Sequence, residues 1–169
     1  MLLLCMGLGA QQKYLLENEK MRAEVDLAQG ALLGLQSKVT GWNVVEDEKA
    51  ACSFEANVKL ANGNFFVINA ASQCRPEVTI QGDKLTFVWN GLNVGDQQLD
   101  ATFTGTITMT PDGLVYGGKV VNKSDAIIEQ LAWPFLGEVS IPADTERMLL
   151  QYMNYTKFNT CLLYTSPSP

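Results

Sequence analysis

The sequence predicts an all-β fold, an antiparallel β-sandwich, and three observations lead to this prediction. Short segments alternate between apolar and polar residues, as strands with one buried face and one wet face do. Turns rich in Gly, Asn and Asp separate these segments. No segment shows the ~3.6-residue apolar period of a long amphipathic helix. Strands joined by tight turns, without long helices, pack as a sandwich or a barrel.

The first segments predict three strands. Residues 14–18 form a short strand, and residues 20–27 alternate, with an apolar face and a charged face that includes Asp26. Residues 28–30 turn the chain, and residues 31–35 continue as a mostly apolar strand. The loop that follows carries an aromatic side chain, Trp42.

Two hairpins come next. Residues 51–60 and 65–68 flank Asn62-Gly63, a dipeptide suited to the positive φ angles of a type I′ turn. Residues 77–80 and 84–90 flank a second turn, and Leu85, Phe87 and Trp89 share one face of its returning strand. Trp89 is therefore expected in the core.

The longest alternation covers residues 99–110, which place threonines on one face and apolar side chains on the other. After a Pro-Asp-Gly turn, residues 114–139 predict an organising hairpin: a strand, a polar turn at 122–125, and a second strand that runs into Trp133. Residues 147–152 form a last strand or a short helix.

Composition limits the function. A chain of 169 residues with 47% hydrophobic and 18% charged residues can form one domain with a sizeable core. The net charge of −6 argues against nucleic-acid binding, because phosphate backbones attract clustered Lys and Arg. Histidine is absent, which removes Ser-His-Asp and Cys-His systems and most zinc sites. No calcium-loop motif occurs either, so we expect no metal and no cofactor.

The two ends differ from the rest of the chain. Residues 1–10 (MLLLCMGLGA) resemble the later part of a secretory signal peptide cleaved after Ala10, with a buried N-terminal strand as the alternative. This run is far shorter than the ~20 apolar residues of a transmembrane helix. We therefore expect a secreted or periplasmic protein.

Residues 161–169 (CLLYTSPSP) resemble the translation of a transposon-end adapter used in preparing sequencing libraries. A natural Ser/Pro-rich linker is the alternative. On the first interpretation the natural sequence stops near Thr160 and the domain covers residues 13–160, truncated on its C-terminal side.

Two cysteines remain once both ends are set aside. Cys52 and Cys74 flank a predicted hairpin, and in an oxidising compartment they can form a disulfide. The alternative is a pair of buried thiols that act as small hydrophobic side chains.

The order of several short segments resembles the galactose-mutarotase-like β-supersandwich domains, which would here be incomplete. In this family a first strand, a "G-x-L-x-x-L" return and a "K-x-T-G" loop are followed by an "x-N-x-S … P-x-L-G" segment. The matching residues are 16–18 (LEN), 25–26 (VD), 30–35 (GALLGL), 38–42 (KVTGW), 121–124 (VNKS) and 133–138 (WPFLGE).

The resemblance implies the N-terminal domain of a secreted glycoside hydrolase, placed before a (β/α)₈ catalytic domain in the same chain. Mutarotase activity does not carry over, because it is expected to need a histidine. No pair of carboxylates indicates glycosidase catalysis, so no catalytic residue is predicted here.

A poly- or oligosaccharide is the expected partner. Trp42 and Trp133 are the candidate platforms for sugar rings, because exposed indoles stack on the C–H faces of pyranoses; the alternative is that both are packing residues. A stand-alone glycan-binding or adhesion module and the β-domain of a polysaccharide lyase remain alternative functions.

Overall fold

The computed structural model describes residues 12–45, 53–136, 139–140, 147–150 and 156–159. The described residues form antiparallel sheets and no α-helix, so the all-β prediction is confirmed. The chain divides into two compact units, residues Met1–Val139 and Ser140–Pro169. The domain bounds drawn from the sequence, residues 13–160, remain a prediction.

The first sheet has four strands in sequence order: β1 (Lys13–Glu17), β2 (Met21–Asp26), β3 (Leu32–Ser37) and β4 (Asn43–Val45). Ala23 and Val25 on β2 are fully buried, as their alternation predicts. Asp26 was expected on the wet face but is only 6% exposed. Its carboxylate accepts a 2.9 Å hydrogen bond from the Ala28 backbone N–H, a turn contact that offsets part of the cost of its burial.

The second sheet supplies most of the core. It consists of β7 (Glu77–Gln81), β8 (Lys84–Val94), β9 (Gln97–Thr110) and β10 (Gly113–Asn122), in the order β10-β9-β8-β7. On β8, Leu85, Phe87 and Trp89 are at most 2% exposed, so the predicted core face is confirmed. From residue 101 to residue 110, buried residues of β9 alternate with half-buried threonines, whereas Gln97, Gln98 and Asp100 before them are exposed.

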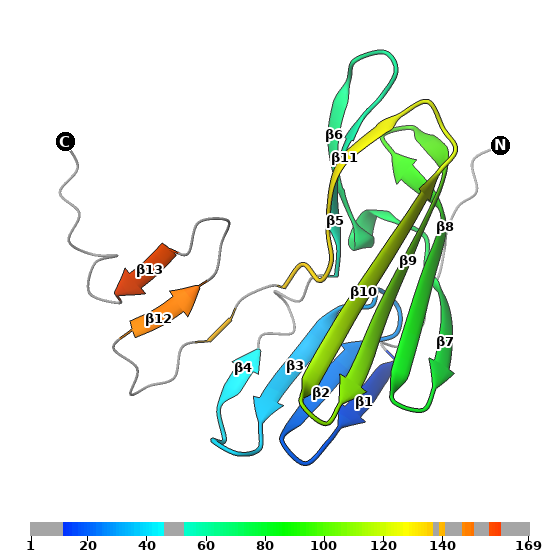
Figure 1. Ribbon diagram of the computed structural model, residues 1–169. Coiled ribbons are helices and arrows are strands. Elements are labelled where there is room, and N and C mark those ends of the chain that lie inside the picture. The colour runs from blue at the N-terminus through cyan, green and yellow to red at the C-terminus, as the bar shows by residue number, and fades with distance from the viewer. Residues whose placement is uncertain (1–11, 46–52, 137–138, 141–146, 151–155, 160–169) are drawn as a thin grey trace, which may run out of the picture. The chain divides into compact units, whose positions relative to one another are not determined.

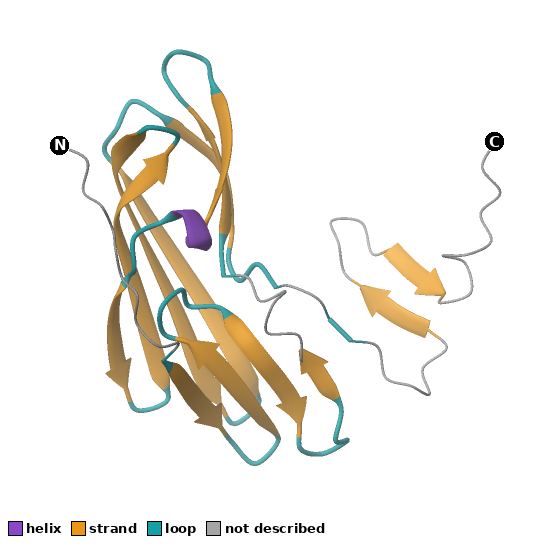
Figure 2. Cartoon of the chain, turned by 180° about the vertical axis from the view of Figure 1, so that it is seen from behind, coloured by secondary structure: helices purple, strands orange, loops and turns teal. Residues whose placement is uncertain are grey.

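The third sheet contains β5 (Glu55–Lys59), β6 (Phe65–Asn69) and β11 (Ile127–Ala132), in the order β11-β5-β6. The predicted β5–β6 hairpin is confirmed, although its connection spans residues 60–64 rather than a two-residue turn. Gly63 there has φ +89°, which glycine adopts easily. A single 3₁₀ turn, η2 (Ala70–Ser72), follows β6 and is seen in purple in Figure 2.

The hairpin predicted over residues 114–139 is wrong. Its two strands exist, but β10 pairs with β9 whereas β11 pairs with β5 in another sheet, as Figure 1 shows. At the turn between them the chain passes from the second sheet to the third. The Asn122 side chain donates to the Ala126 carbonyl (2.7 Å) and accepts from Ser124, which fixes this crossover, and Ala126 is buried at its end.

Buried side chains of all three sheets form one hydrophobic core. In the second unit, β12 (Arg147–Leu150) and β13 (Thr156–Asn159) pair as an antiparallel ribbon. The last predicted element is therefore a strand, not a short helix.

Candidate functional site

Trp133 follows β11 and lies on a pair of glycines. Gly105 on β9 is directly opposite Gly118 on β10. A Cβ atom added to Gly105 would stand 2.8 Å from the Trp133 ring, whereas one added to Gly118 would stand 3.5 Å from it. Because neither strand has a side chain at this level, the indole can approach the sheet backbone.

Aromatic side chains surround this indole. Its ring centroid lies 5.6 Å from Phe103, 5.8 Å from Tyr116, 6.1 Å from Trp89 and 6.3 Å from Phe87, each in an edge-on arrangement. Such pairs stabilise a core beyond the area that they bury. Trp133 is half-buried and extends the core, and its use as a sugar platform stays a prediction.

Several polar atoms are buried beside these rings without a hydrogen-bond partner among the described residues. They are Trp133 Nε1, Trp89 Nε1, Tyr116 Oη and Ser53 Oγ. Burial raises the pKa of Tyr116 to about 12, because the ionised phenolate would lose its hydration. The Ser53 carbonyl accepts a 2.6 Å hydrogen bond from the Phe135 backbone N–H, which ties the chain after Trp133 to the start of β5.

Trp42 lies on a different sheet, in the turn between β3 and β4. It is half-buried, and its Nε1 is buried without a hydrogen-bond partner among the described residues. Its backbone carbonyl accepts from the Ser37 N–H (2.8 Å), and its N–H donates to Thr40 Oγ1 (3.3 Å). Trp42 is absent from the rings around Trp133, so the structure does not bring the two predicted platforms into one site.

Cys74 is disulfide-bonded. Cys52 lies outside the described residues, so the pairing of Cys52 with Cys74 remains a prediction. Near Cys74, the Gln73 side chain exchanges two hydrogen bonds with the Asn93 backbone, at 2.7 and 3.2 Å. The segment before β7 is thereby held against the end of β8.

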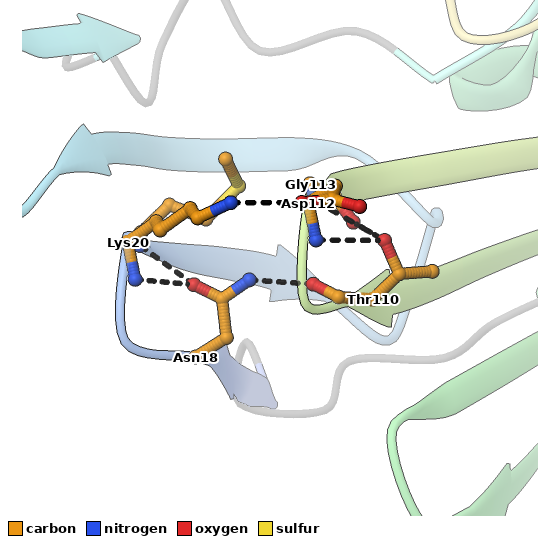
Figure 3. Close-up of polar contacts among 6 residues, drawn as sticks. Asn18, Lys20, Thr110, Asp112 and Gly113 are labelled. Carbon is orange, nitrogen blue, oxygen red and sulfur yellow. Dashed lines mark hydrogen bonds and ion pairs between the residues drawn. The ribbon is translucent and has the colours of Figure 1, made fainter.

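A cleft of about 440 Å³ lies at one end of the sandwich, where the turns after β1, β7 and β9 meet. Figure 3 shows the contacts that join two of these turns. Asn18 Nδ2 donates to the Thr110 carbonyl (2.5 Å), and Lys20 Nζ donates to Asp112 Oδ1 (2.8 Å). Asn18 Oδ1 also accepts from the backbone N–H groups of Lys20 and Met21. These turns brace the first sheet against the second, a role that the sequence did not indicate.

One carboxylate beside this brace has a shifted pKa. Lys38 Nζ forms a hydrogen bond and ion pair with Glu17, and both effects lower the pKa of that carboxyl. Lys38 also donates to the Asn18 carbonyl at 2.7 Å. With the bond from the Lys38 backbone N–H to the Lys20 carbonyl (2.8 Å), these contacts hold the β1–β2 turn against the residue that follows β3.

Among the described residues, no group of three or more His, Cys, Asp or Glu side chains is placed to hold a metal ion. No helix in that part of the chain is long and apolar enough to cross a membrane. Three acidic residues, Glu17, Glu19 and Asp83, line the cleft at the β1–β2 turn, and the sequence predicted no catalytic pair of carboxylates.

Comparisons with known proteins agree with this fold. No protein-family model matches the chain, and no curated protein matches it. The structure is similar to a galactose mutarotase-like protein from Lactobacillus casei ATCC 334, with a TM-score of 0.50 and 17% identity over 67% of this chain and 45% of that one. It is also similar to a 4-alpha-glucanotransferase from Thermococcus litoralis, with a TM-score of 0.51 and 13% identity over 69% of this chain and 23% of that one.

At these identities the similarity shows the fold alone. The chain spans less than half the length of either protein. It is a β-sandwich with the architecture found in part of a galactose mutarotase-like protein and in part of a glucanotransferase.

Proposed function

We propose that this chain is a non-catalytic, N-terminal β-sandwich domain of a secreted or periplasmic carbohydrate-active enzyme, a glycoside hydrolase. In this role it supports a catalytic domain in the same polypeptide and contacts glycan. The observation that carries the proposal is the similarity of fold to a mutarotase-like protein and to a glucanotransferase. The apolar segment at residues 1–10 supports export.

The described surface is consistent with a supporting role. The polar contacts of Asn18 and Lys20 fix turns against each other, and the Trp133 indole joins the third sheet to the second. Absence of histidine removes the residue expected of a free-standing mutarotase.

The test is the longer coding sequence from the same source. We expect it to continue into a (β/α)₈ pattern with paired acidic residues, and we expect removal of residues 13–139 to lower the melting temperature of the catalytic domain. A continuation without that pattern would refute the proposal. Unsaturated products from the longer protein would instead indicate a polysaccharide lyase.

A further inference from the structure

The third sheet presents an unusual outer face. Its inner face, which includes Ala56 and Val58, packs into the core. On the opposite face Phe65, Val67 and Ile127 are 53%, 59% and 58% exposed. Strand β6 is therefore apolar on both faces, although burial requires only one.

The registers place these exposed side chains in adjacent rows. Phe65 pairs with Lys59, which pairs with Ile127, and Val67 pairs with Asn57, which pairs with Gln130. Neighbouring strands lie about 4.8 Å apart, so the first row extends about 10 Å across the sheet. Figure 1 shows β5, β6 and β11 side by side.

Two amides lie in the second row of this face. Asn57 Nδ2 donates to Gln130 Oε1 at 3.3 Å. That bond leaves Asn57 Oδ1 as an acceptor and Gln130 Nε2 as a donor, and no other partner of either atom occurs among the described residues. The two amides thus orient each other and offer both kinds of hydrogen bond beside an exposed aromatic ring.

The three charged side chains at this sheet, Lys59, Glu55 and Glu129, sum to −1. Lys59 and Glu55 point outward from opposite ends of β5, and an exposed Glu129 sits at the bulge of β11. An anionic ligand would meet this acid and a chain with a net charge of −6. A neutral ligand with apolar faces and hydroxyl edges is the chemical match.

We infer that the outer face of the β11-β5-β6 sheet is a binding site for a neutral oligosaccharide. The Phe65 ring receives the C–H face of one sugar, Val67 and Ile127 extend the apolar surface, and the Asn57–Gln130 pair bonds to hydroxyl groups. Ligand sites commonly combine such an apolar surface with a few convergent polar groups. The choice of a sugar as the ligand rests on the proposed function, whereas the location of the site rests on the exposed residues of this sheet.

The experiment uses the full chain in affinity gel electrophoresis with neutral polysaccharides: soluble starch, mixed-linkage β-glucan and galactomannan. We expect at least one of them to retard the chain. Phe65→Ala should weaken that association about tenfold or more, as loss of a central aromatic contact does. Asn57→Ala should weaken it about threefold to tenfold.

Matched variants separate stacking from general hydrophobicity. Val67→Ser should weaken binding, whereas Val115→Ser, on β10 and 54% exposed, should leave it unchanged. Phe65→Leu keeps the apolar character but removes the ring, and should also weaken binding. Circular dichroism identifies any variant that fails to fold, and Phe65→Tyr, which keeps the ring, then serves as the folded comparison and should bind.

Three results would overturn the inference: no retardation by any of the polysaccharides, equal effects of Val67→Ser and Val115→Ser, or full binding by Phe65→Leu. The last result would indicate an apolar protein contact instead. Failure of the proposed function gives a different result. In that case the longer coding sequence lacks the (β/α)₈ pattern, while the isolated chain still binds the polysaccharide.

Discussion

Substitution of Gly105 by alanine tests how Trp133 is held. The new Cβ would lie 2.8 Å from two carbon atoms of the indole and 3.2 Å from a third. Such distances require the ring or the strand to move, and overpacking of this kind costs about 1–3 kcal/mol. A glycine-to-alanine change also restricts the unfolded chain, which returns about 0.4–1 kcal/mol. We expect a net loss of about 1–2 kcal/mol.

Gly118→Ala is the matched control. Gly118 is opposite Gly105 on the neighbouring strand, but its added Cβ would have ordinary contacts, 3.4 Å to Phe103 and 3.5 Å to Trp133. Urea unfolding followed by circular dichroism measures both variants. Because no clash offsets the restriction of the unfolded chain, we expect Gly118→Ala to be neutral or to stabilise the fold by about 0.4–1 kcal/mol.

A double-mutant cycle completes the test. Trp133→Ala alone should cost about 3 kcal/mol, because it leaves a cavity among four aromatic rings. In that background Gly105→Ala meets no indole, so it should become neutral or stabilising by about 0.4–1 kcal/mol. Equal effects of Gly105→Ala with and without the indole would refute the packing argument.

Three other perturbations have defined outcomes. The pKa of Tyr116 is raised to about 12, so between about pH 10 and 12 the folded state keeps the phenol proton while the unfolded state loses it. The free energy of unfolding should therefore fall over that window, by up to about 2–3 kcal/mol. Tyr116→Phe should remove this part of the alkaline slope when urea unfolding is repeated at each pH. The pKa of Glu17 is lowered in the folded state, so its contribution to stability is present above the pKa of the unfolded state and is lost as the pH falls through the pKa of the folded state. Glu17→Gln should therefore flatten the acid side of a plot of melting temperature against pH. An unchanged plot would contradict the Lys38 contact. Asn18→Ala removes the hydrogen bond to the Thr110 carbonyl and the two bonds that the Asn18 side chain accepts within its own turn. Thermal unfolding should show a decrease in the free energy of unfolding of about 1–3 kcal/mol. A decrease below about 0.5 kcal/mol would show that these turns do not brace the sheets.

Local patterns predicted the strands well. Alternation on β8 and β9 identified both the elements and their buried faces, because one buried face imposes a period of two on the sequence. Pairing between strands was harder. The β10–β11 hairpin was wrong because a turn sequence such as that at Asn122 shows where the chain bends, but not which sheet receives the next strand.

The sites depend on contacts between distant residues, and this limited their prediction. Trp133 precedes a proline at the end of a strand, a position where exposure is common, and nothing near it in the sequence reveals the Gly105–Gly118 pair. Two glycines on separate strands carry no pattern until their register is known. The outward Phe65 and Val67 were visible as part of an apolar run, but their exposure depends on which face β5 and β11 leave open.

The pairing of β11 with β5 has a kinetic consequence. All of β6 to β10 lies between these partners in the sequence, so the third sheet is completed only by closing a long loop. The β5–β6 hairpin and the β7–β10 meander each close over short sequence separations, so they can form before β11 pairs with β5. Refolding should therefore show backbone amides of β8 and β9 protected from hydrogen exchange before those of β11.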